Sequence, residues 1–256
     1  AEVVTIAGGV VFDGETLRTA SFSDRIPRAG DSVQGIQAGG FRRIQVTSLL
    51  ASTLAFGFED DGTRKVQRSL ILDEDGEDDN ESSGATEEDA FADIEYALSR
   101  VIGSDDGPVT IHITSFSNDA RRELRYPLQM VDHIKVKGDV EEGRDVIEID
   151  AEGTGNVISF NHTVGAEIEN LKLKGGTAGK GGGIRMYESD PVLKNIEISE
   201  NSSTGKGGGI FSIRSAPLLD NVTISGNNSR KGAGAYFMYS DPLIENTLIT
   251  GNIINA

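Results

Sequence analysis

Three lysines recur at the same position of a repeating C-terminal sequence, directly before a glycine-rich segment. They are Lys180, Lys206 and Lys231. If the repeats stack, the three ammonium groups form a row on a chain whose net charge is −17. A second recurring position carries Arg185, Phe211 and Tyr236. Cations beside aromatic rings suit an anionic or neutral glycan, through ionic contacts, hydrogen bonds and stacking on sugar faces.

Two points about these columns stay open in the sequence. The lysines could instead only solubilise a glycine-rich loop and keep its strands from pairing with other chains. The outward face of the strand that carries Arg185, Phe211 and Tyr236 is also undecided, because both alternating sets of its residues contain large apolar side chains. Ligand binding by these two columns is therefore a hypothesis that depends on the fold.

Catalysis has weaker support in the sequence. No pair of carboxylates recurs on the strand after the glycines, as a general acid and base would require. Asp190 and Asp241 share a repeat position, but Ala216 stands between them, and each aspartate precedes a proline as turn residues do. No Gly-x-Ser-x-Gly nucleophile motif occurs. The remaining candidates for a catalytic role are Arg185, Asp190 and Lys206.

An acidic stretch offers one pattern that suits a metal ion. Asp73, Asp75 and Glu77 alternate like the first ligands of a calcium loop, which needs hard oxygen donors at short spacing. The glycine is misplaced for an EF-hand, and the distal glutamate is out of register. We favour the alternative, a self-repelling acidic linker over residues 73–85, and expect no cofactor other than this calcium candidate. Zinc-ligand spacing is absent from the three histidines, His112, His133 and His162.

The elements that would position these residues repeat every 25 or 26 residues. Each unit carries a glycine-rich segment, a proline, an asparagine and an Ile-x-x-Asn segment. The glycine-rich segments cover residues 181–184, 207–210 and 232–235, and the Ile-x-x-Asn segments cover 198–201, 224–227 and 249–252. A fixed period in this range, built from short apolar strands and glycine turns, is typical of a solenoid of stacked coils.

Aligning the repeats predicts which side chains lie above one another. One apolar column contains Ile168, Leu193, Leu219 and Ile244, and another contains Leu173, Ile198, Ile224 and Ile249. A polar column contains Asn170, Asn195, Asn221 and Asn246. Asparagine tolerates the left-handed conformation of a sharp turn, and stacked amides can hydrogen-bond from coil to coil as an asparagine ladder.

Other segments flank the repeats. Residues 1–72 alternate β-prone runs with turn residues, including 44–47 and a hairpin turn at 60–62, and show no repeat. An apolar stripe over residues 86–103 predicts an α-helix that covers the open first coil of a solenoid over 107–256. Because the chain stops where another glycine segment would begin, we expect a truncated solenoid whose last coil continues into further repeats or self-associates.

Composition excludes several classes of protein. Cysteine is absent, which removes disulfide and thiolate chemistry. The net charge of −17 argues against nucleic acid or an anionic membrane as the main partner. No apolar run approaches the roughly 20 residues needed to cross a bilayer. The chain begins at Ala1 and continues at once into a strand-like run, so we expect a secreted origin.

The repeats resemble a known group of proteins. Short strands with an asparagine ladder at one corner are similar to the right-handed parallel β-helix of the pectate-lyase-like superfamily. The pairing of Gly-Gly-Gly-Ile with Ile-x-x-Asn is closer still to bacterial surface and autotransporter passenger proteins. The resemblance covers residues 107–256 and is strongest from 156. It implies the fold but not one activity, because the superfamily includes lyases, hydrolases and adhesins.

We therefore expect an all-β chain: a right-handed parallel β-helix with an N-terminal β-rich segment and a capping α-helix. Its expected role is non-catalytic, in an extracellular or surface protein of bacteria that binds a polysaccharide or a cell-surface protein, or acts as a rigid spacer. The alternative is a polysaccharide lyase or related enzyme acting on an acidic polysaccharide. Lyases of this superfamily use an acidic calcium site with an arginine or lysine base.

Overall fold

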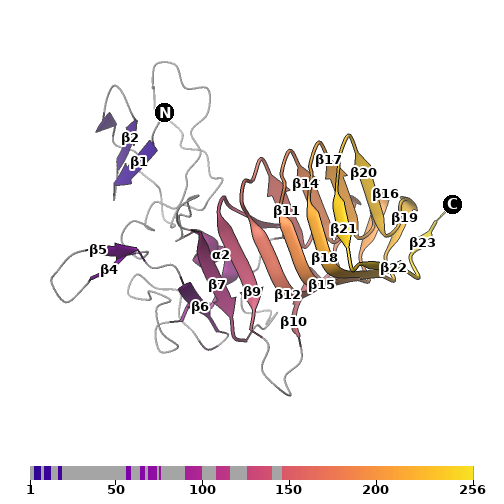
Figure 1. The fold of residues 1–256 in the computed structure, drawn as a ribbon, viewed down its shortest axis with the longest axis horizontal. Coiled ribbons are helices and arrows are strands. Elements are labelled where there is room, and N and C mark those ends of the chain that lie inside the picture. The colour runs from indigo at the N-terminus through magenta and orange to yellow at the C-terminus, as the bar shows by residue number, and fades with distance from the viewer. Residues whose placement is uncertain are drawn as a thin grey trace.

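The parallel β-helix is the main feature of the computed structural model (Figure 1). The structure describes residues 3–6, 9–12, 17–18, 56–58, 64–66, 69–73, 75, 90–99, 108–115, 126–139 and 146–255. Strands from successive coils pair in parallel to form three sheets along the helix axis. Parallel strands lie about 4.8 Å apart, so equivalent residues of neighbouring coils are stacked at this spacing.

Three sheets make up the wall. The first contains β6 (Ser69–Leu72), β7 (Val109–Ile113), β9 (Ile134–Gly138), β12 (Glu167–Lys174), β15 (Val192–Ser199), β18 (Leu218–Ser225) and β21 (Leu243–Glu245), with β10 (Ile147–Asp150) beside β12 and β22 (Leu248–Thr250) beside β18. The second contains β8 (Leu128–Gln129), β11 (Ile158–Asn161), β14 (Ile184–Tyr187), β17 (Ile210–Ile213) and β20 (Ala235–Met238). The third contains β13 (Thr177–Lys180), β16 (Ser202–Lys206), β19 (Asn228–Lys231) and β23 (Ile253–Ile254).

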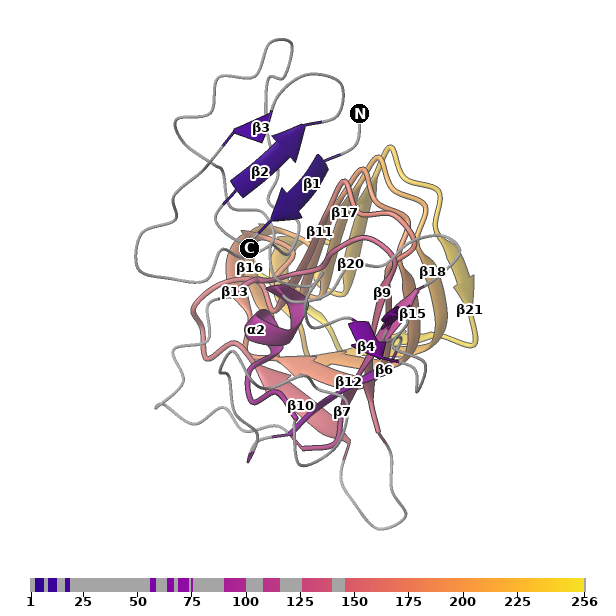
Figure 2. The same ribbon diagram turned by 90° about the vertical axis from the view of Figure 1, so that its left-hand side faces the viewer.

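The hand of the helix is visible from its N-terminal end (Figure 2). In this view β16 lies at the left, β17 above and β18 at the right, while the chain recedes from the viewer. Each coil therefore turns clockwise as it moves away, which is a right-handed path. The prediction of a right-handed parallel β-helix is confirmed, in agreement with the general handedness of parallel crossover connections.

The N-terminal strands outside the helix are antiparallel. β1 (Val3–Ile6), β2 (Gly9–Phe12) and β3 (Leu17–Arg18) form one small sheet, and β4 (Phe56–Phe58) pairs with β5 (Arg64–Val66). This agrees with the β-rich character expected for residues 1–72, although the proposed strand at 44–47 and the turn at 60–62 lie outside the described residues. β6 instead pairs in parallel with β7. The helix wall therefore begins before residue 107, the predicted boundary.

The capping helix is shorter at its start than predicted. The helix α2 covers Ile94–Ser99, and the Asp93 carboxylate caps it by accepting hydrogen bonds from the backbone N–H groups of Glu95 and Tyr96. Phe91, expected on the helix stripe, is extended and exchanges backbone hydrogen bonds with the chain around β6. Residues 90–93 are described and are not helical, while 86–89 and 100–103 of the predicted range lie outside the described residues.

The apolar face of α2 still closes the first coils. Phe91, Ile94 and Leu98 are buried and belong to the same apolar cluster as the helix interior. In Figure 2, α2 lies in front of the space enclosed by the sheets. This placement covers apolar side chains that would otherwise face water at the end of the stack.

Both predicted apolar columns are confirmed by the strand registers. In the first sheet Ile168 pairs with Leu193 and Leu193 with Leu219, and the column continues to Ile244. The second column is Leu173, Ile198, Ile224 and Ile249. The members of both columns in β12, β15 and β18 are completely buried. Each coil therefore supplies its part of a continuous core, and burial of apolar area is the main stabilising contribution.

The exposed asparagine ladder is confirmed for three coils. Asn170, Asn195 and Asn221 have φ values of 56°, 53° and 55°, in the left-handed region predicted for this corner. Asn195 donates to the Asn170 side chain at 3.0 Å, and Asn221 donates to Asn195 at 2.9 Å. Asn246 differs, because its amide donates to the Asp220 carboxylate at 2.9 Å. The carboxylate is a stronger acceptor than the Asn221 amide oxygen.

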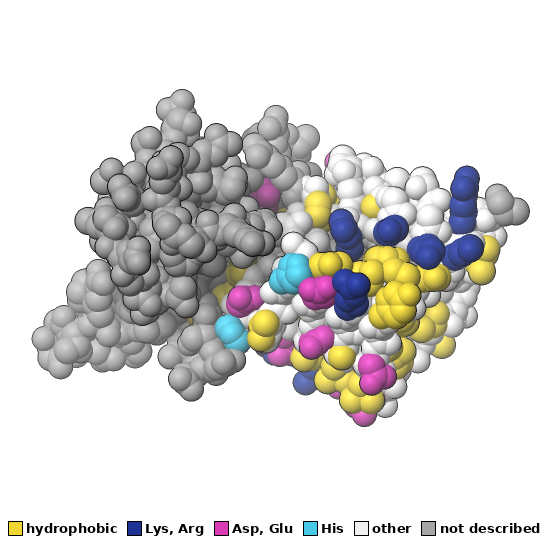
Figure 3. Space-filling model, turned by 90° about the horizontal axis from the view of Figure 1, so that it is seen from above, with side chains coloured by type: hydrophobic (Ala, Val, Ile, Leu, Met, Phe, Trp, Pro, Cys, Tyr) yellow, Lys and Arg dark blue, Asp and Glu magenta, His cyan; other side chains and the backbone are white. Residues whose placement is uncertain are grey.

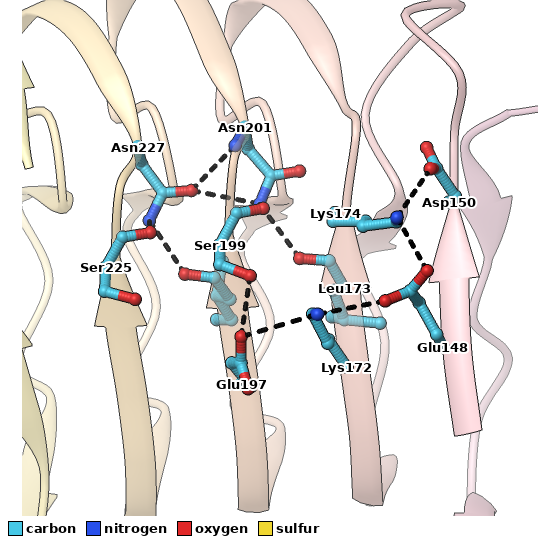
Figure 4. Close-up of polar contacts among 11 residues, drawn as sticks. Glu148, Asp150, Lys172, Leu173, Lys174, Glu197, Ser199, Asn201, Ser225 and Asn227 are labelled. Atoms are coloured by element: carbon cyan, nitrogen blue, oxygen red, sulfur yellow. Dashed lines mark hydrogen bonds and ion pairs between the residues drawn. The ribbon is translucent and has the colours of Figure 1, made fainter. Parts of the chain in front are cut away.

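A second ladder lies inside the coil and was not assigned from the sequence (Figure 4). Asn201, Asn227 and Asn252 are the last residues of the Ile-x-x-Asn segments. Each side-chain oxygen accepts from the preceding coil, as when Asn227 accepts from the Asn201 backbone N–H at 3.0 Å. Asn201 and Asn227 are 1% and 0% exposed. These amides satisfy backbone groups that the turn would otherwise leave buried and unpaired.

The glycine-rich segments form the corner between the third and second sheets. Gly207 has φ of 67°, a conformation that glycine adopts without strain. A Cβ atom on Gly208 would lie 2.4 Å from the Asn228 carbonyl oxygen in the next coil. This close approach of backbones leaves no room for a side chain at Gly208, which explains why glycine recurs where another coil stacks on the corner.

The last described coil is apolar and exposed. Its exposed side chains include Leu243, Ile244, Leu248, Ile249, Ile253 and Ile254. The prediction that this coil continues into further repeats or self-associates stays a prediction. Among the described residues, no helix has the length and apolar character required to traverse a bilayer.

Candidate functional site

The second sheet shows which face of its strands carries Arg185, Phe211 and Tyr236, a point that the sequence left open. Ile184 and Met186 of β14 are completely buried in the coil. Because side chains alternate along a strand, Arg185 lies on the outer face. Arg185 pairs in register with Phe211, and Phe211 pairs with Tyr236. The column Arg185, Phe211 and Tyr236 therefore lies on the outside of the helix.

The lysine row lies beside this column, as the repeat predicts. Lys180 pairs with Lys206, and Lys206 pairs with Lys231, across irregularities in the third sheet. The Lys180 ammonium lies 5.4 Å from the centre of the Phe211 ring, and the Lys206 ammonium lies 4.5 Å from the centre of the Tyr236 ring. Each of these two lysines thus covers the aromatic ring of the next coil, an attraction between cation and ring face.

The two rings stack on one another. The Phe211 and Tyr236 ring centres are 6.0 Å apart with an angle of 10° between the planes. The Lys206 ammonium also donates to the Tyr236 hydroxyl at 3.1 Å. Phe211 is only 2% exposed beneath its neighbours, whereas Tyr236 is half-buried and Arg185 is exposed. A ligand would therefore meet the cations, Arg185 and the Tyr236 ring, with Phe211 as their support.

We define the lysine–aromatic face by these six residues. They are Lys180, Lys206, Lys231, Arg185, Phe211 and Tyr236. Figure 3 looks onto this side of the molecule and shows dark blue basic side chains along a group of yellow hydrophobic ones. The next outward column of the second sheet adds the half-buried Tyr187, Ile213 and Met238. Strand alternation could have identified this column once the outward set was known.

A charged cluster lies beyond that apolar column. Glu188 accepts from the Arg214 guanidinium at 3.1 Å and lies 3.2 Å from His162. The hydrogen bond from Arg214 lowers the pKa of the Glu188 carboxyl. The ring of His162 also contacts Tyr187 edge-on, with centres 5.0 Å apart. These side chains satisfy one another and border the apolar strip opposite the lysines.

The three catalytic candidates lie in different environments. Asp190 accepts a hydrogen bond of 2.5 Å from the Ala216 backbone N–H in the next coil, which is a turn-stabilising contact. Lys206 is engaged with Tyr236, and Arg185 lies exposed on β14. Asp190 is thus hydrogen-bonded as the sequence suggested for a turn residue. The described face therefore presents cations and aromatic rings, while Asp190 is held in a turn contact.

Lysines on the first sheet have a different environment (Figure 4). Lys174 lies 2.7 Å from Glu148 and 3.3 Å from Asp150, and Lys172 lies 3.0 Å from Glu148. The hydrogen bond from Lys174 lowers the pKa of Glu148. These lysines are neutralised by carboxylates of neighbouring coils and support the stack.

Low pH is expected to remove the stability that carboxylate–lysine contacts on the first sheet contribute. Burial raises the pKa of Glu169, but its contacts with Lys135 outweigh burial, so the pKa lies below 4.5. A carboxyl whose pKa is lowered by folding contributes stability above its unfolded pKa, and this contribution is lost as pH falls through the folded value. We expect the melting temperature to fall as pH decreases below about 4.5, and to fall less steeply in Lys135→Met, which retains the apolar stem. The same decrease of melting temperature with pH in both proteins, measured by thermal unfolding, would contradict this assignment.

The calcium candidate is only partly within the described residues. Asp73 accepts from the Asp75 backbone N–H at 3.0 Å and from the Thr114 hydroxyl at 2.6 Å, while Glu77 lies outside the described part. His112 contacts Asp139 at 2.9 Å, and His133 lies at the turn before β9. The described residues contain no group of three potential metal ligands. Calcium at the acidic stretch stays a prediction.

The chain has no significant match to any protein-family model, curated protein or solved structure. The fold and the lysine–aromatic face are therefore the basis for a functional conclusion. Fold alone would not be sufficient, because parallel β-helices carry many unrelated functions.

Proposed function

We propose that this chain is a non-catalytic, glycan-binding β-helix that uses the lysine–aromatic face. The observation that carries the proposal is the placement of Lys180 and Lys206 over Phe211 and Tyr236 on the outer side of the wall. Sugar rings offer apolar faces to aromatic and aliphatic side chains, and their hydroxyl or acidic groups accept hydrogen bonds from ammonium groups. The rigid stack holds these groups in place before binding.

The proposal includes an extracellular or cell-surface location in bacteria. It is supported by the glycine and asparagine repeats, which resemble those of surface and autotransporter passenger proteins within the pectate-lyase-like superfamily. The absence of cysteine in the sequence is compatible with this location. A rigid spacer would need the stack but not a cluster of cations and rings on one side, so the cluster favours binding.

A Tyr236→Ala variant tests the proposal directly. We expect about tenfold weaker binding to the glycans that the unmodified protein captures on an array, because removing a stacking ring costs about 1.4 kcal/mol. Tyr239→Ala is the matched control, since Tyr239 is 83% exposed and lies outside the face. Equal binding by both variants, or no captured glycan at all, would reject the assignment.

A second measurement separates binding from catalysis. The protein is incubated with uronate polymers and calcium, and unsaturated products are followed by their absorbance. We expect no turnover, because the described face lacks a paired acid and base. Turnover would overturn the non-catalytic assignment and return attention to Arg185, Asp190 and Lys206.

A further inference from the structure

The outer face of the second sheet has a basic edge and an acidic edge. Lys180, Lys206 and Lys231 lie at its border with the third sheet, where β13, β16 and β19 end. Asp190 and Asp241 lie at the opposite corner, three residues after the ends of β14 and β20. Figure 3 shows basic side chains along one side of the hydrophobic group and acidic side chains mainly along the other. An apolar strip therefore separates opposite charges on this face.

The charges of both edges are accessible to a ligand. Among the described residues, none of these five side chains has an oppositely charged group within 4.0 Å. Lys174 of the first sheet, by contrast, contacts two carboxylates. Asp190 uses one carboxylate oxygen to accept from the Ala216 backbone N–H, which leaves its other oxygen for a further donor. A ligand with complementary charges can therefore pair with both edges.

The two edges are connected within single coils. Asp190 follows Lys180 by ten residues, and Asp241 follows Lys231 by the same number, with β14 or β20 between them. The coil in the middle has Ala216 at the acidic position. A strand of four residues spans about 10 Å, so the opposite charges of one coil are separated by at least about this distance. Two coils thus each present a cation, outward side chains of the second sheet and a carboxylate in one line.

The charge around this face is balanced. Residues 156–256 contain nine lysines and arginines and nine aspartates and glutamates, so the net charge of −17 arises in the residues before them. Exposed charges are screened beyond a Debye length of about 8 Å at physiological salt. A ligand of one sign gains at one edge and meets like charge at the other. A ligand that carries both signs gains at both edges, and without a net charge it is not repelled by the acidic N-terminal part.

The distance between the edges limits the size of the ligand. In a free amino acid or a zwitterionic lipid head group, the charges are only a few bonds apart and cannot reach both edges. A folded partner needs roughly 800 Å² from each side, whereas four strands of four residues with both edges cover roughly 500 Å². A short glycan is long enough to join the edges and narrow enough to lie along one coil.

We infer that the glycan bound by this face is amphoteric, with both acidic groups and free amino groups, and that it lies along the strands of the second sheet, perpendicular to the helix axis. Its acidic group contacts the lysine of a coil, and its ammonium group contacts the aspartate of the same coil. Its ring faces pack on the outward side chains between them, such as Tyr236 and Met238 in the coil of β20. This inference rests on the proposed glycan binding and specifies the charges and the direction of the glycan.

The test compares three tetrasaccharides by calorimetry at about pH 6, where aspartates are ionised and lysines are protonated. The amphoteric probe alternates glucuronate with unsubstituted glucosamine. The acidic probe alternates glucuronate with N-acetylglucosamine, and the basic probe contains glucosamine alone. We expect the amphoteric probe to bind at least tenfold more tightly than either of the others, because only this probe can pair with both edges.

Two double variants assign the probe charges to the two edges. Asp190→Asn with Asp241→Asn removes both carboxylates, while an amide oxygen can still accept the turn hydrogen bond from Ala216. We expect this variant to bind the amphoteric and acidic probes with affinities within about twofold of each other. Lys180→Ala with Lys231→Ala should remove the preference for the amphoteric probe over the basic one to the same extent.

A charge-matched control separates local from global effects. Glu200→Gln with Glu245→Gln changes the net charge by the same amount as the aspartate double variant, at exposed positions after β15 and on β21. We expect its affinities for all three probes to stay within about twofold of those of the unmodified protein. A loss as large as that of the aspartate variant would show a general charge effect and overturn the inference.

The outcomes also distinguish this inference from the proposed function. If the three probes bind equally and Tyr236→Ala weakens all of them, glycan binding stands and the amphoteric specificity is wrong. The same conclusion holds if none of the probes binds while the array captures other glycans. If the array captures no glycan at all, both are wrong. The direction is tested with an amphoteric octasaccharide, which should bind within about threefold of the tetrasaccharide. Affinity that rises steadily with length would show that the glycan follows the helix axis, and the arrangement along the strands would be wrong.

Discussion

Replacing Asn227 with alanine is expected to lower the free energy of unfolding by about 3 kcal/mol or more. The side chain is fully buried, and its oxygen accepts from the backbone and the side chain of Asn201 at 3.0 Å. Its amide donates to the carbonyl oxygens of Ile198 and Ser225. Truncation leaves several buried groups without these partners, and each costs about 1–3 kcal/mol.

Asn221→Gly is the matched control in the same coil. Asn221 belongs to the exposed ladder, and glycine adopts its φ of 55° without strain. We expect a change within about 1 kcal/mol, because water replaces the lost amide contact. Urea unfolding followed by circular dichroism measures both variants. Equal shifts would mean that the buried ladder stabilises the fold no more than the exposed one.

Much of the fold could be predicted because stacking turns a sequence repeat into a spatial column. The positions of Ile168, Leu193 and Leu219 coincide in the repeat and also pair in the first sheet. A buried parallel strand cannot slip by one residue without turning its apolar side chains outward. The length of the sequence repeat and the apolar core of the coil therefore specify the strand register together. The left-handed asparagine corner follows from the same alignment.

The orientation of the second sheet could not be predicted in this way. Phe211 faces outward although it is 2% exposed, while Ser212 faces inward and is completely buried. Hydrophobicity alone would predict the opposite orientations, with Phe211 inward and Ser212 outward. The inward serine is accommodated because its hydroxyl donates to the Ser240 hydroxyl at 3.0 Å, and the outward phenylalanine because Lys180 and Tyr236 cover it. Both compensations come from other coils.

The buried ladder has a recurring sequence pattern, but its structural role does not follow from that pattern. The Ile-x-x-Asn segments placed Asn201, Asn227 and Asn252 at one repeat position. In the structure these asparagines point inward to backbone groups, whereas Asn195 and Asn221 point outward. The start of α2 was missed for a related reason. Phe91 fits a helical stripe, but backbone pairing beside β6 holds it extended.

Gly208→Ala should be among the most destabilising single changes in the wall. The added Cβ would lie 2.4 Å from the Asn228 carbonyl oxygen and 2.5 Å from the Ala233 carbonyl oxygen. Both atoms belong to the backbone of the next coil, so no side-chain rotation relieves the contact. Separating the two coils would also disturb the glycine-corner hydrogen bonds, and we expect a loss of about 3 kcal/mol, at the upper end for overpacking.

Gly179→Ala provides the comparison at an open position. No atom lies within 4 Å of a Cβ built there, so alanine should be neutral or should stabilise by up to about 1 kcal/mol through the unfolded chain. Melting temperatures of both variants, measured together, give the contrast. A Gly208→Ala protein as stable as Gly179→Ala would mean that the coils can separate at this corner. The close stacking that places Lys180 over Phe211 would then lose its physical basis, because the same coil spacing sets both contacts.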